Sequence, residues 1–216
     1  NGWRHRVARL ARQDSTRPGA AGQPRERRWP TTRDEDGVLQ VRSGPKKKGG
    51  ILWTEKEYRD FVLRVDWRIK ETPWVNPRAK IVMPDGSDKK GPDGKEIDIA
   101  VPDSDSGIYM RGTSKAQVNV WCWPIGSGEF YGYRTDPSVS PDVRKGVTPL
   151  PQADNPVGEW NRFEITVKGD RVTVVLNDVK VIDNALMSTI RVEARMRGLS
   201  VDKDPLHNRR DGVLYL

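Results

Sequence analysis

Apolar and polar residues alternate most clearly over positions 61–69 of this chain. The odd positions from Phe61 to Ile69 are apolar, whereas the even positions include Arg64 and Asp66. A period of two residues places alternate side chains on opposite faces of a β-strand. The pattern therefore predicts a half-buried strand over residues 61–69.

Segments of similar pattern recur along the chain and are separated by short breaks rich in Gly, Asp and Asn. Two of these breaks, 168–171 and 176–179, have the composition of tight hairpin turns. Between residues 71 and 97 the Pro and Gly residues are so frequent that we expect an elaborated loop. Consecutive hairpins with few helical periods predict an antiparallel sandwich or barrel. Further strands are expected at 38–42, 51–53, 96–101, 106–111, 116–123, 161–168, 171–177 and 179–183.

One of these strands, over residues 117–123, has two contrasting faces. Gln117, Asn119, Trp121 and Trp123 share one face, and small apolar residues occupy the other. Side-chain amides bond sugar hydroxyls, and flat rings stack on the apolar side of a pyranose. The face is thus either an open sugar-binding surface or a set of aromatic residues that fill the core of a sandwich.

Neighbouring residues would extend this surface. If the apolar neighbours of Tyr109 enter the core, Tyr109 and Arg111 point to the same open face as the amides. Tyr131 and Tyr133 follow the strand and are further candidates to stack on a sugar, although some of these rings must be core residues. The candidate sugar-binding residues are Tyr109, Gln117, Asn119, Trp121, Trp123, Tyr131 and Tyr133.

The length of 216 residues fits one large all-β domain. The net charge is +8, and residues 1–34 hold nine Arg against three acidic residues, a balance of +6. Such an arm suits either phosphate binding or a solvated leader. We expect a leader and no nucleic-acid partner, because no nucleic-acid motif accompanies the arginines. The expected organisation is a basic, poorly patterned segment at 1–36 and a single β-sandwich domain at 37–216.

The sequence also bears on where the protein is found. No run approaches the roughly 18 apolar residues that cross a bilayer, so we expect no membrane span. The chain begins with Asn1, and no apolar core of a secretory signal follows it. We expect a periplasmic or extracellular protein whose signal has already been removed. The oligomeric state is not indicated.

Three aspartates of the expected 71–97 loop are candidate metal ligands. Asp85, Asp88 and Asp93 lie in or near two Pro-Asp-Gly turns. Oxygen ligands of this kind could gather a divalent cation such as Ca²⁺. Their spacing does not match the EF-hand loop, and acidic turns are common, so solvated turns are the alternative.

Several short motifs follow one another through the middle of the chain, at 35–39, 54–61, 105–112, 117–123 with 131–133, and 158–165. In this order they resemble the 3-keto-disaccharide hydrolase domain family. The resemblance implies an all-β fold, a concanavalin A-like jelly-roll sandwich of two antiparallel sheets with long loops and few helices. It also implies an oligosaccharide or glycoside as the partner.

The chain departs from the family at both ends. Family members often carry Gly-Pro-Ile-Gly-Leu-Gln near the C-terminus, then a turn with a histidine and a last strand. Here 195–201 and 204–207 stand in those places, and the histidine turn is not recognisable. The first 34 residues lack the usual opening of the family, apart from Gly2-Trp3.

Two kinds of glycoside chemistry are possible. An ordinary glycosidase needs two carboxylates that flank the scissile bond. The 117–123 strand carries none, so a pair would have to come from loops, such as Glu129 with Asp103 or Asp105. The resemblance implies a different reaction, in which a ketone at C3 of the sugar acidifies the proton at C2. One base and one electrophile can then expel the substituent at C1.

The candidate catalytic residues follow from this implied reaction. His207 or Glu129 would be the base, and Arg111 or a bound cation would stabilise the enolate oxygen. His207 is one of two histidines and could instead be a surface residue, and a three-histidine metal site is excluded by that count. Arg111 could instead form an ion pair with Asp105 or Glu164.

These observations favour a carbohydrate-active protein that cleaves a glycosidic bond of a 3-keto sugar on a concave sheet face. A carbohydrate-binding module without catalysis is the first alternative, because the histidine turn is missing. A structural or assembly protein, which would use its basic arm to hold acidic partners, is the second.

Overall fold

The computed structural model describes residues 58–187, together with short strand segments at 10–11, 31–33, 39–41, 53–54 and 214–215. Every strand pair is antiparallel within this described part of the chain. None of its helices is long and apolar enough to cross a membrane. The strands dominate, with two short α-helices between them, which confirms the expected all-β sandwich.

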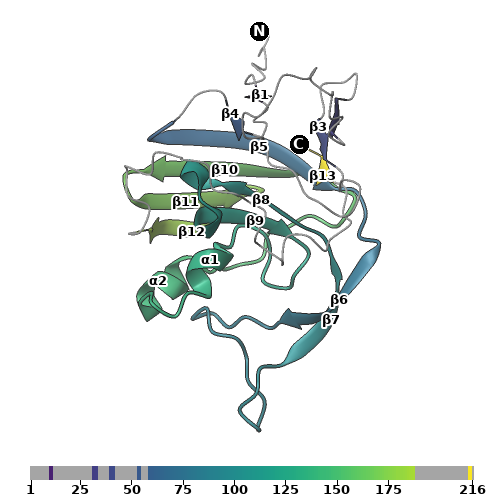
Figure 1. The fold of residues 1–216 in the computed structure, drawn as a ribbon, viewed down its shortest axis with the longest axis vertical. Helices are drawn as coiled ribbons and strands as arrows, with labels where there is room; N and C mark the ends of the chain where they lie inside the picture. Colours follow the sequence, from purple (N-terminus) through teal and green to yellow (C-terminus); the bar gives the residue numbers. More distant parts are fainter. Residues whose placement is uncertain are drawn as a thin grey trace, which may run out of the picture.

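A seven-stranded sheet forms one layer of the sandwich (Figure 1). Its centre is the pair β5 and β10, in which Arg162 lies opposite Asp66 and Glu164 opposite Arg64. The order of the strands is β12-β11-β10-β5-β13-β3-β2. Their bounds are β12 Val179–Leu186, β11 Arg171–Leu176, β10 Asn161–Lys168, β5 Phe61–Ile69, β13 Leu214–Tyr215, β3 Leu39–Val41 and β2 Thr31–Arg33.

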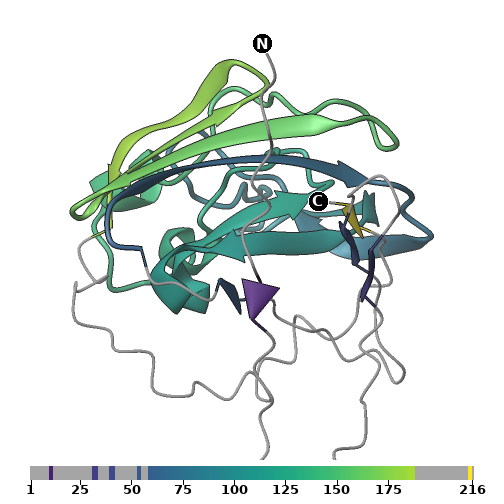
Figure 2. The same cartoon turned by 90° about the horizontal axis from the view of Figure 1, so that it is seen from above.

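The strands β8 (Asp105–Tyr109) and β9 (Gln117–Trp121) lie across the core from this sheet, as Figure 2 shows. Val118 and Val120 of β9 contact the same apolar cluster as Phe163 of the large sheet. Two one-turn 3-10 helices, Met110–Gly112 and Ser114–Ala116, connect β8 to β9. The remaining pairs are β6 (Trp74–Lys80) with β7 (Asp98–Asp103), and β1 (Leu10–Ala11) with β4 (Trp53–Thr54).

The large sheet has one buried and one solvent-facing side. Phe163, Ile165 and Val167 of β10 are buried, whereas Arg162 and Lys168 are exposed. The same alternation runs along β5, so the pattern of the sequence correctly gave both the strand and its faces. We call the solvent-facing side of β5, β10 and β11 the outward face.

Both predicted hairpin turns are present. Lys168 pairs with Arg171, and Leu176 pairs with Val179, so each turn has two residues at its tip. Asn177 and Asp178 both adopt positive φ, at 48° and 65°. Two successive residues with positive φ are typical of the type I′ turn, whose twist matches that of the flanking strands.

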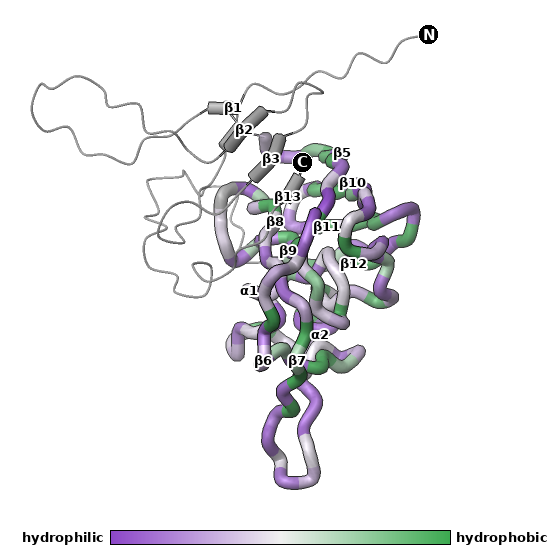
Figure 3. The backbone as a smooth tube through the Cα atoms, turned by 90° about the vertical axis from the view of Figure 1, so that its right-hand side faces the viewer, coloured by the Kyte–Doolittle hydropathy of each residue, from purple (hydrophilic) through white to green (hydrophobic). Residues whose placement is uncertain are grey.

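The segment 71–97 is more regular than expected. It contains β6, which the sequence pattern missed because Pro77 interrupts it and the register shifts between Asn76 and Ala79. Residues 81–97 then form a long β6–β7 hairpin extension, which projects from the body of the molecule in Figure 3. Two isolated bridges, Val82 with Asp88 and Lys90 with Glu96, close it along its length.

Two short helices follow β9. Helix α1 (Tyr131–Arg134) and helix α2 (Pro141–Gly146) lie in the long connection between β9 and β10. Ser140 caps α2, because its side-chain oxygen accepts a hydrogen bond from the Val143 N–H at 3.3 Å. Ser followed by Pro is a recognisable helix start, so the sequence held a signal for α2.

Candidate functional site

The strand predicted to be an open sugar-binding face is buried on both sides. Gln117 and Asn119 are each 4% exposed. Gln117 donates from Nε2 to the Ser106 carbonyl at 3.1 Å, and its side chain fills the space beside Gly107. The backbone of Asn119 bonds Gly128 and Glu129, so the segment after β9 folds back along it. The prediction of an open amide face is therefore wrong.

The two indoles of this strand fill a second core. Trp121 and Trp123 stack with ring centroids 4.4 Å apart and an interplanar angle of 6°. Both ring nitrogens are satisfied inside the protein, since Trp121 donates to the Gly126 carbonyl at 2.8 Å and Trp123 donates to Asp103 at 3.1 Å. The surrounding cluster joins Ala79 of β6, Val101 of β7 and Ile125. The core interpretation of the aromatic residues is the correct one.

The predicted tyrosines are also engaged in packing. Tyr133 is fully buried in the main core, and Tyr131 meets Trp121 edge to face at 6.0 Å. Tyr109 ends β8 opposite Gln117 and is partly buried. The stacking platform expected from these rings is thus absent from the described surface around β9.

Glu129 lies at the centre of a buried charge network. Its carboxylate is 0% exposed and is bonded by Nε of Arg134. Arg134 also donates to Asp88 at 2.8 Å and to the Gly86 carbonyl at 3.3 Å. One guanidinium therefore serves two carboxylates, and burial raises the pKa of Glu129 to about 7. This arrangement favours a structural role, and catalysis by Glu129 stays a prediction.

Arg111 also holds the fold together. It adopts a φ of 51° and donates from Nε and Nη2 to the Arg59 carbonyl, at 3.0 and 2.7 Å. Its ion pair is with Asp60 at 3.1 Å, and its side chain is 9% exposed. The expected ion pair of Arg111 with Asp105 or Glu164 is wrong, because Arg111 pairs with Asp60 and Glu164 pairs with Arg64. Arg111 thereby fastens the turn after β8 to the start of β5.

Each of the three candidate metal ligands bonds a different partner within the protein. Asp85 accepts from Ser87, Asp93 accepts from the Lys95 N–H at 3.1 Å, and Asp88 pairs with Arg134. Within residues 58–187 no group of three metal-ligating side chains comes together. The structure therefore does not bring these aspartates together as a cation site. The candidate base His207 lies outside the described residues.

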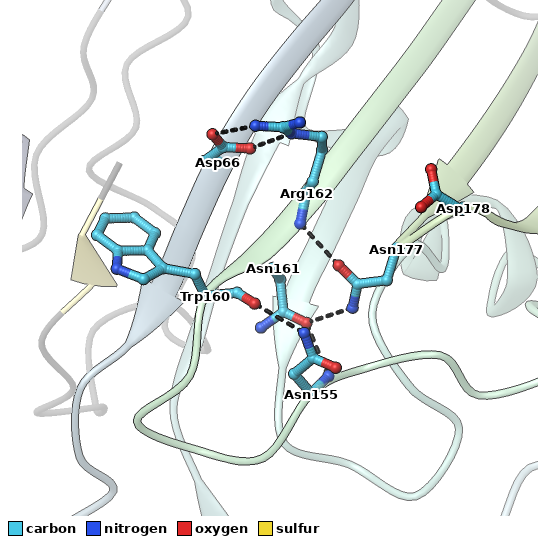
Figure 4. Close-up of a pocket in the computed structure, with 7 residues that line it drawn as sticks. All are labelled: Asp66, Asn155, Trp160, Asn161, Arg162, Asn177 and Asp178. Carbon is cyan, nitrogen blue, oxygen red and sulfur yellow. Dashed lines mark hydrogen bonds and ion pairs between the residues drawn. The ribbon is translucent and has the colours of Figure 1, made fainter.

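The outward face of the large sheet carries a polar hollow of about 600 Å³ (Figure 4). Trp160 lies on one side of it and Asp178 on the other, with the pair of Asp66 and Arg162 between them. Arg162 donates from Nε and Nη2 to the two oxygens of Asp66, at 2.6 and 2.8 Å. The described residues that line this Trp160 hollow are Asp66, Asn155, Trp160, Asn161, Arg162, Asn177 and Asp178.

Hydrogen bonds between amides fix the floor of the Trp160 hollow. Asn161 Oδ1 accepts from the Asn155 N–H and from Nδ2 of Asn177, both at 2.8 Å. Asn177 Oδ1 accepts from the Arg162 N–H at 2.9 Å, and Asn155 donates to the Trp160 carbonyl at 2.8 Å. These amides are occupied with each other and with backbone, so the hollow is held in shape before any ligand arrives.

Most of the chain matches one protein family. The model of the 3-keto-alpha-glucoside-1,2-lyase-like domain aligns with residues 1–204. This chain belongs to that family. The resemblance read from the motifs at 35–165 is therefore confirmed, even though the Trp-rich strand of this family member is buried.

Solved structures give a more distant similarity. Two crystal structures of proposed glycosyl hydrolases from Parabacteroides distasonis ATCC 8503 match 84% of this chain. The first is 20% identical to this chain, has a TM-score of 0.43, and is covered over 64% of its own length. The second is 16% identical, has a TM-score of 0.35, and is covered over 74% of its own length. This family member thus spans less than two thirds of the first structure. No curated protein matches the chain.

The residues of the Trp160 hollow were not predicted to form a site, although three of them had a signal in the sequence. The alternation of 61–69 placed Asp66 on the outward face, and Trp160 and Arg162 belong to a motif of this 3-keto-alpha-glucoside-1,2-lyase-like domain. Their proximity depends on the register that sets Arg162 opposite Asp66. Register is a property of the folded sheet, and the pattern of a single strand does not contain it.

Proposed function

We propose that this protein cleaves the glycosidic bond of a 3-keto sugar, with an α-glucoside as the substrate class. The family match over residues 1–204 carries this proposal, because the family is described by a 1,2-lyase activity on 3-keto-α-glucosides. The sandwich fold and the polar hollow on its surface agree with a carbohydrate-active protein.

The proposed reaction is an elimination followed by addition of water. A base removes the proton from C2, and the electron pair forms an enolate that is stabilised by the C3 ketone. The pair then forms the C1–C2 double bond, and the C1–O bond breaks. The leaving oxygen takes a proton and departs as the free alcohol or sugar. Water adds at C1 and a proton returns to C2, which gives the free 3-keto sugar.

This reaction needs one base, and we propose His207 for it. Glu129 is fully buried and bonded by Arg134, so a substrate carbon has no access to it in this structure. Histidine titrates close to neutral pH, which suits a residue that takes up and returns a proton. His207→Asn should lower kcat by at least about a hundredfold, which is the usual size of a general-base contribution. His5→Asn, which changes the other histidine, should leave kcat unchanged.

The proposal is tested with an α-linked 3-keto disaccharide that carries deuterium at C2. We expect release of free monosaccharide and loss of the deuterium to water, both faster than without protein. The parent disaccharide without the ketone should not be cleaved, because its C2 proton is not acidic. Release of monosaccharide with full retention of the deuterium would exclude elimination and favour direct hydrolysis.

A binding module without catalysis is the second candidate. It is favoured by the burial of Glu129 and by the engagement of Arg111 with Asp60, since two of the three predicted catalytic residues are used by the fold. The same experiment separates the two candidates. A protein that binds the 3-keto disaccharide but does not accelerate its cleavage would be a binding module.

A further inference from the structure

We propose that the Trp160 hollow is a saccharide-binding site on the outward face of the seven-stranded sheet. This proposal rests on the proposed function only for the class of its ligand, which is a neutral α-glucoside. Its walls are an aromatic ring, a carboxylate–guanidinium pair and a separate carboxylate, from Trp160, Asp66 with Arg162, and Asp178. Its volume of about 600 Å³ lies in the range of small-molecule sites.

Trp160 supplies the stacking surface. Trp160 is 39% exposed, although a tryptophan is normally well buried. The guanidinium of Arg68 lies 4.9 Å from the ring centroid, and this cation–π contact holds the indole in place. An indole that is fixed and still partly exposed can cover the apolar side of a pyranose with little further loss of side-chain entropy.

The polar groups suit hydroxyls. Asp178 is exposed, and among residues 58–187 its carboxylate has no hydrogen-bonding partner. Arg162 uses Nε and Nη2 for Asp66, and no bond of Nη1 is formed within the same described range. The hollow therefore offers a donor at Arg162 and an acceptor at Asp178, the two partners that a sugar hydroxyl can use.

The charges of the described residues favour a neutral ligand over a strongly anionic one. Asp66 and Asp178 contribute two negative charges, and Arg162 with the nearby Arg68 contributes two positive charges. A polyphosphate or sulfated chain would meet Asp178 without a net positive field to compensate it. A neutral saccharide meets no such cost.

A second, smaller hollow extends the site across the sheet. It has a volume of about 300 Å³ and shares Arg162 and Asp178 with the Trp160 hollow. Arg64, Glu164 and Val175 complete its described lining. The two hollows therefore adjoin each other at Arg162 and Asp178, and an oligosaccharide could contact both where a single sugar would contact one.

The test uses the full chain and titrations with glucose, trehalose and maltotriose. In ¹H–¹⁵N spectra the Trp160 indole N–H signal, identified by its loss in Trp160→Phe, should shift with sugar, most strongly with maltotriose. Trp160→Ala should weaken maltotriose binding by about tenfold or more. Trp74→Ala is the matched control, because Trp74 is similarly exposed at 36% but lies on β6.

A second variant keeps the test independent of folding. Asp178→Asn preserves the positive φ of 65° at this turn position, which asparagine adopts readily. It removes the charge and replaces one acceptor oxygen with a donating NH2 group. We expect maltotriose binding to weaken several-fold. No shift of the Trp160 signal with any of the three sugars, or equal binding by wild type and Trp160→Ala, would overturn the site.

The outcome is distinguishable from that of the proposed function. Shifts at Trp160 without cleavage of the 3-keto disaccharide would support this site and contradict the proposed enzyme. Cleavage without any shift at Trp160 would support the enzyme and overturn this site.

Discussion

Trp121 and Trp123 stack on each other within the protein, with their ring centroids 4.4 Å apart. Trp121 is the last residue of β9 and Trp123 follows it in the next segment, and both indoles pack in one cluster with Ala79 of β6 and Val101 of β7. The pair therefore stabilises the contact between β9 and the β6–β7 hairpin.

The first prediction concerns this stacked pair. Trp123→Ala should lower the free energy of unfolding by about 3–5 kcal/mol, because it removes a buried indole and leaves Asp103 without its bond at 3.1 Å. Trp74→Ala, at a partly exposed indole, should cost much less. Urea unfolding followed by circular dichroism measures both. A loss below about 1 kcal/mol for Trp123→Ala would contradict the core role.

The second prediction concerns pH and Glu129. The folded protein raises the pKa of Glu129 to about 7 from 4.5, so the folded state holds this proton more tightly than the unfolded state. The stabilisation is complete below the unfolded pKa and is lost as pH rises through the folded pKa. Between pH 4.5 and about 7 the contribution of Glu129 to stability should therefore fall, on the order of 1 kcal/mol per pH unit.

Glu129→Gln isolates this contribution from the other titrating groups. The variant cannot ionise at residue 129, so its stability should decline less between pH 4.5 and 7 than that of the wild type. The exposed glutamate in Glu159→Gln is the control and should leave the wild-type curve unchanged. Thermal unfolding across this pH range provides the measurement. Parallel curves for Glu129→Gln and wild type would show that the raised pKa of Glu129 is wrong.

The sequence predicted those strands whose two faces differ in polarity. In β5 and β10 the alternation of Phe163 and Ile165 with Arg162 and Glu164 reports directly which side is buried. In β9 both faces are buried, because Val118 enters one core and Trp121 enters another. The alternation of residue types along β9 then separates the side chains of two cores, and it does not indicate that either face is exposed to water.

The sequence could not predict which polar side chains are exposed, for a related reason. The sequence does not distinguish an exposed side-chain amide from one that is bonded to the backbone. Gln117 is of the second kind, because it donates to the Ser106 carbonyl. Glu129 and Arg134 are close in sequence, but Asp88 joins them from the distant hairpin extension. Contacts of this kind follow from tertiary packing, which local patterns do not specify.

The third prediction concerns Arg134. It bonds Glu129 and Asp88 while its side chain is 2% exposed, so Arg134→Ala leaves a buried carboxylate without its partner. We expect a loss of about 3–5 kcal/mol in the free energy of unfolding. Arg64→Ala breaks the exposed pair with Glu164, in which the Arg64 side chain is 72% exposed, and should cost less than about 1 kcal/mol.

Hydrogen exchange separates a local effect of Arg134→Ala from a global one. Arg134 holds the Gly86 carbonyl, so amides of the hairpin extension such as Lys89, which bonds the Ile81 carbonyl at 2.8 Å, should exchange faster. Amides at the centre of β10 should be affected less. Equal costs for Arg134→Ala and Arg64→Ala would show that Arg134 does not fix the hairpin extension.

The last prediction compares two glycines of that hairpin extension. Gly86 and Gly94 have nearly the same φ, 80° and 79°, but different surroundings. An added Cβ at Gly86 would lie 2.6 Å from Arg144 Cγ and from Thr148 Oγ1, whereas at Gly94 it would meet nothing within 4 Å. Gly94→Ala therefore carries only backbone strain, about 1 kcal/mol, and Gly86→Ala should cost a further 1–3 kcal/mol or so from overpacking. Chemical denaturation of the two variants measures the difference, and equal losses would mean that Gly86 does not pack against α2.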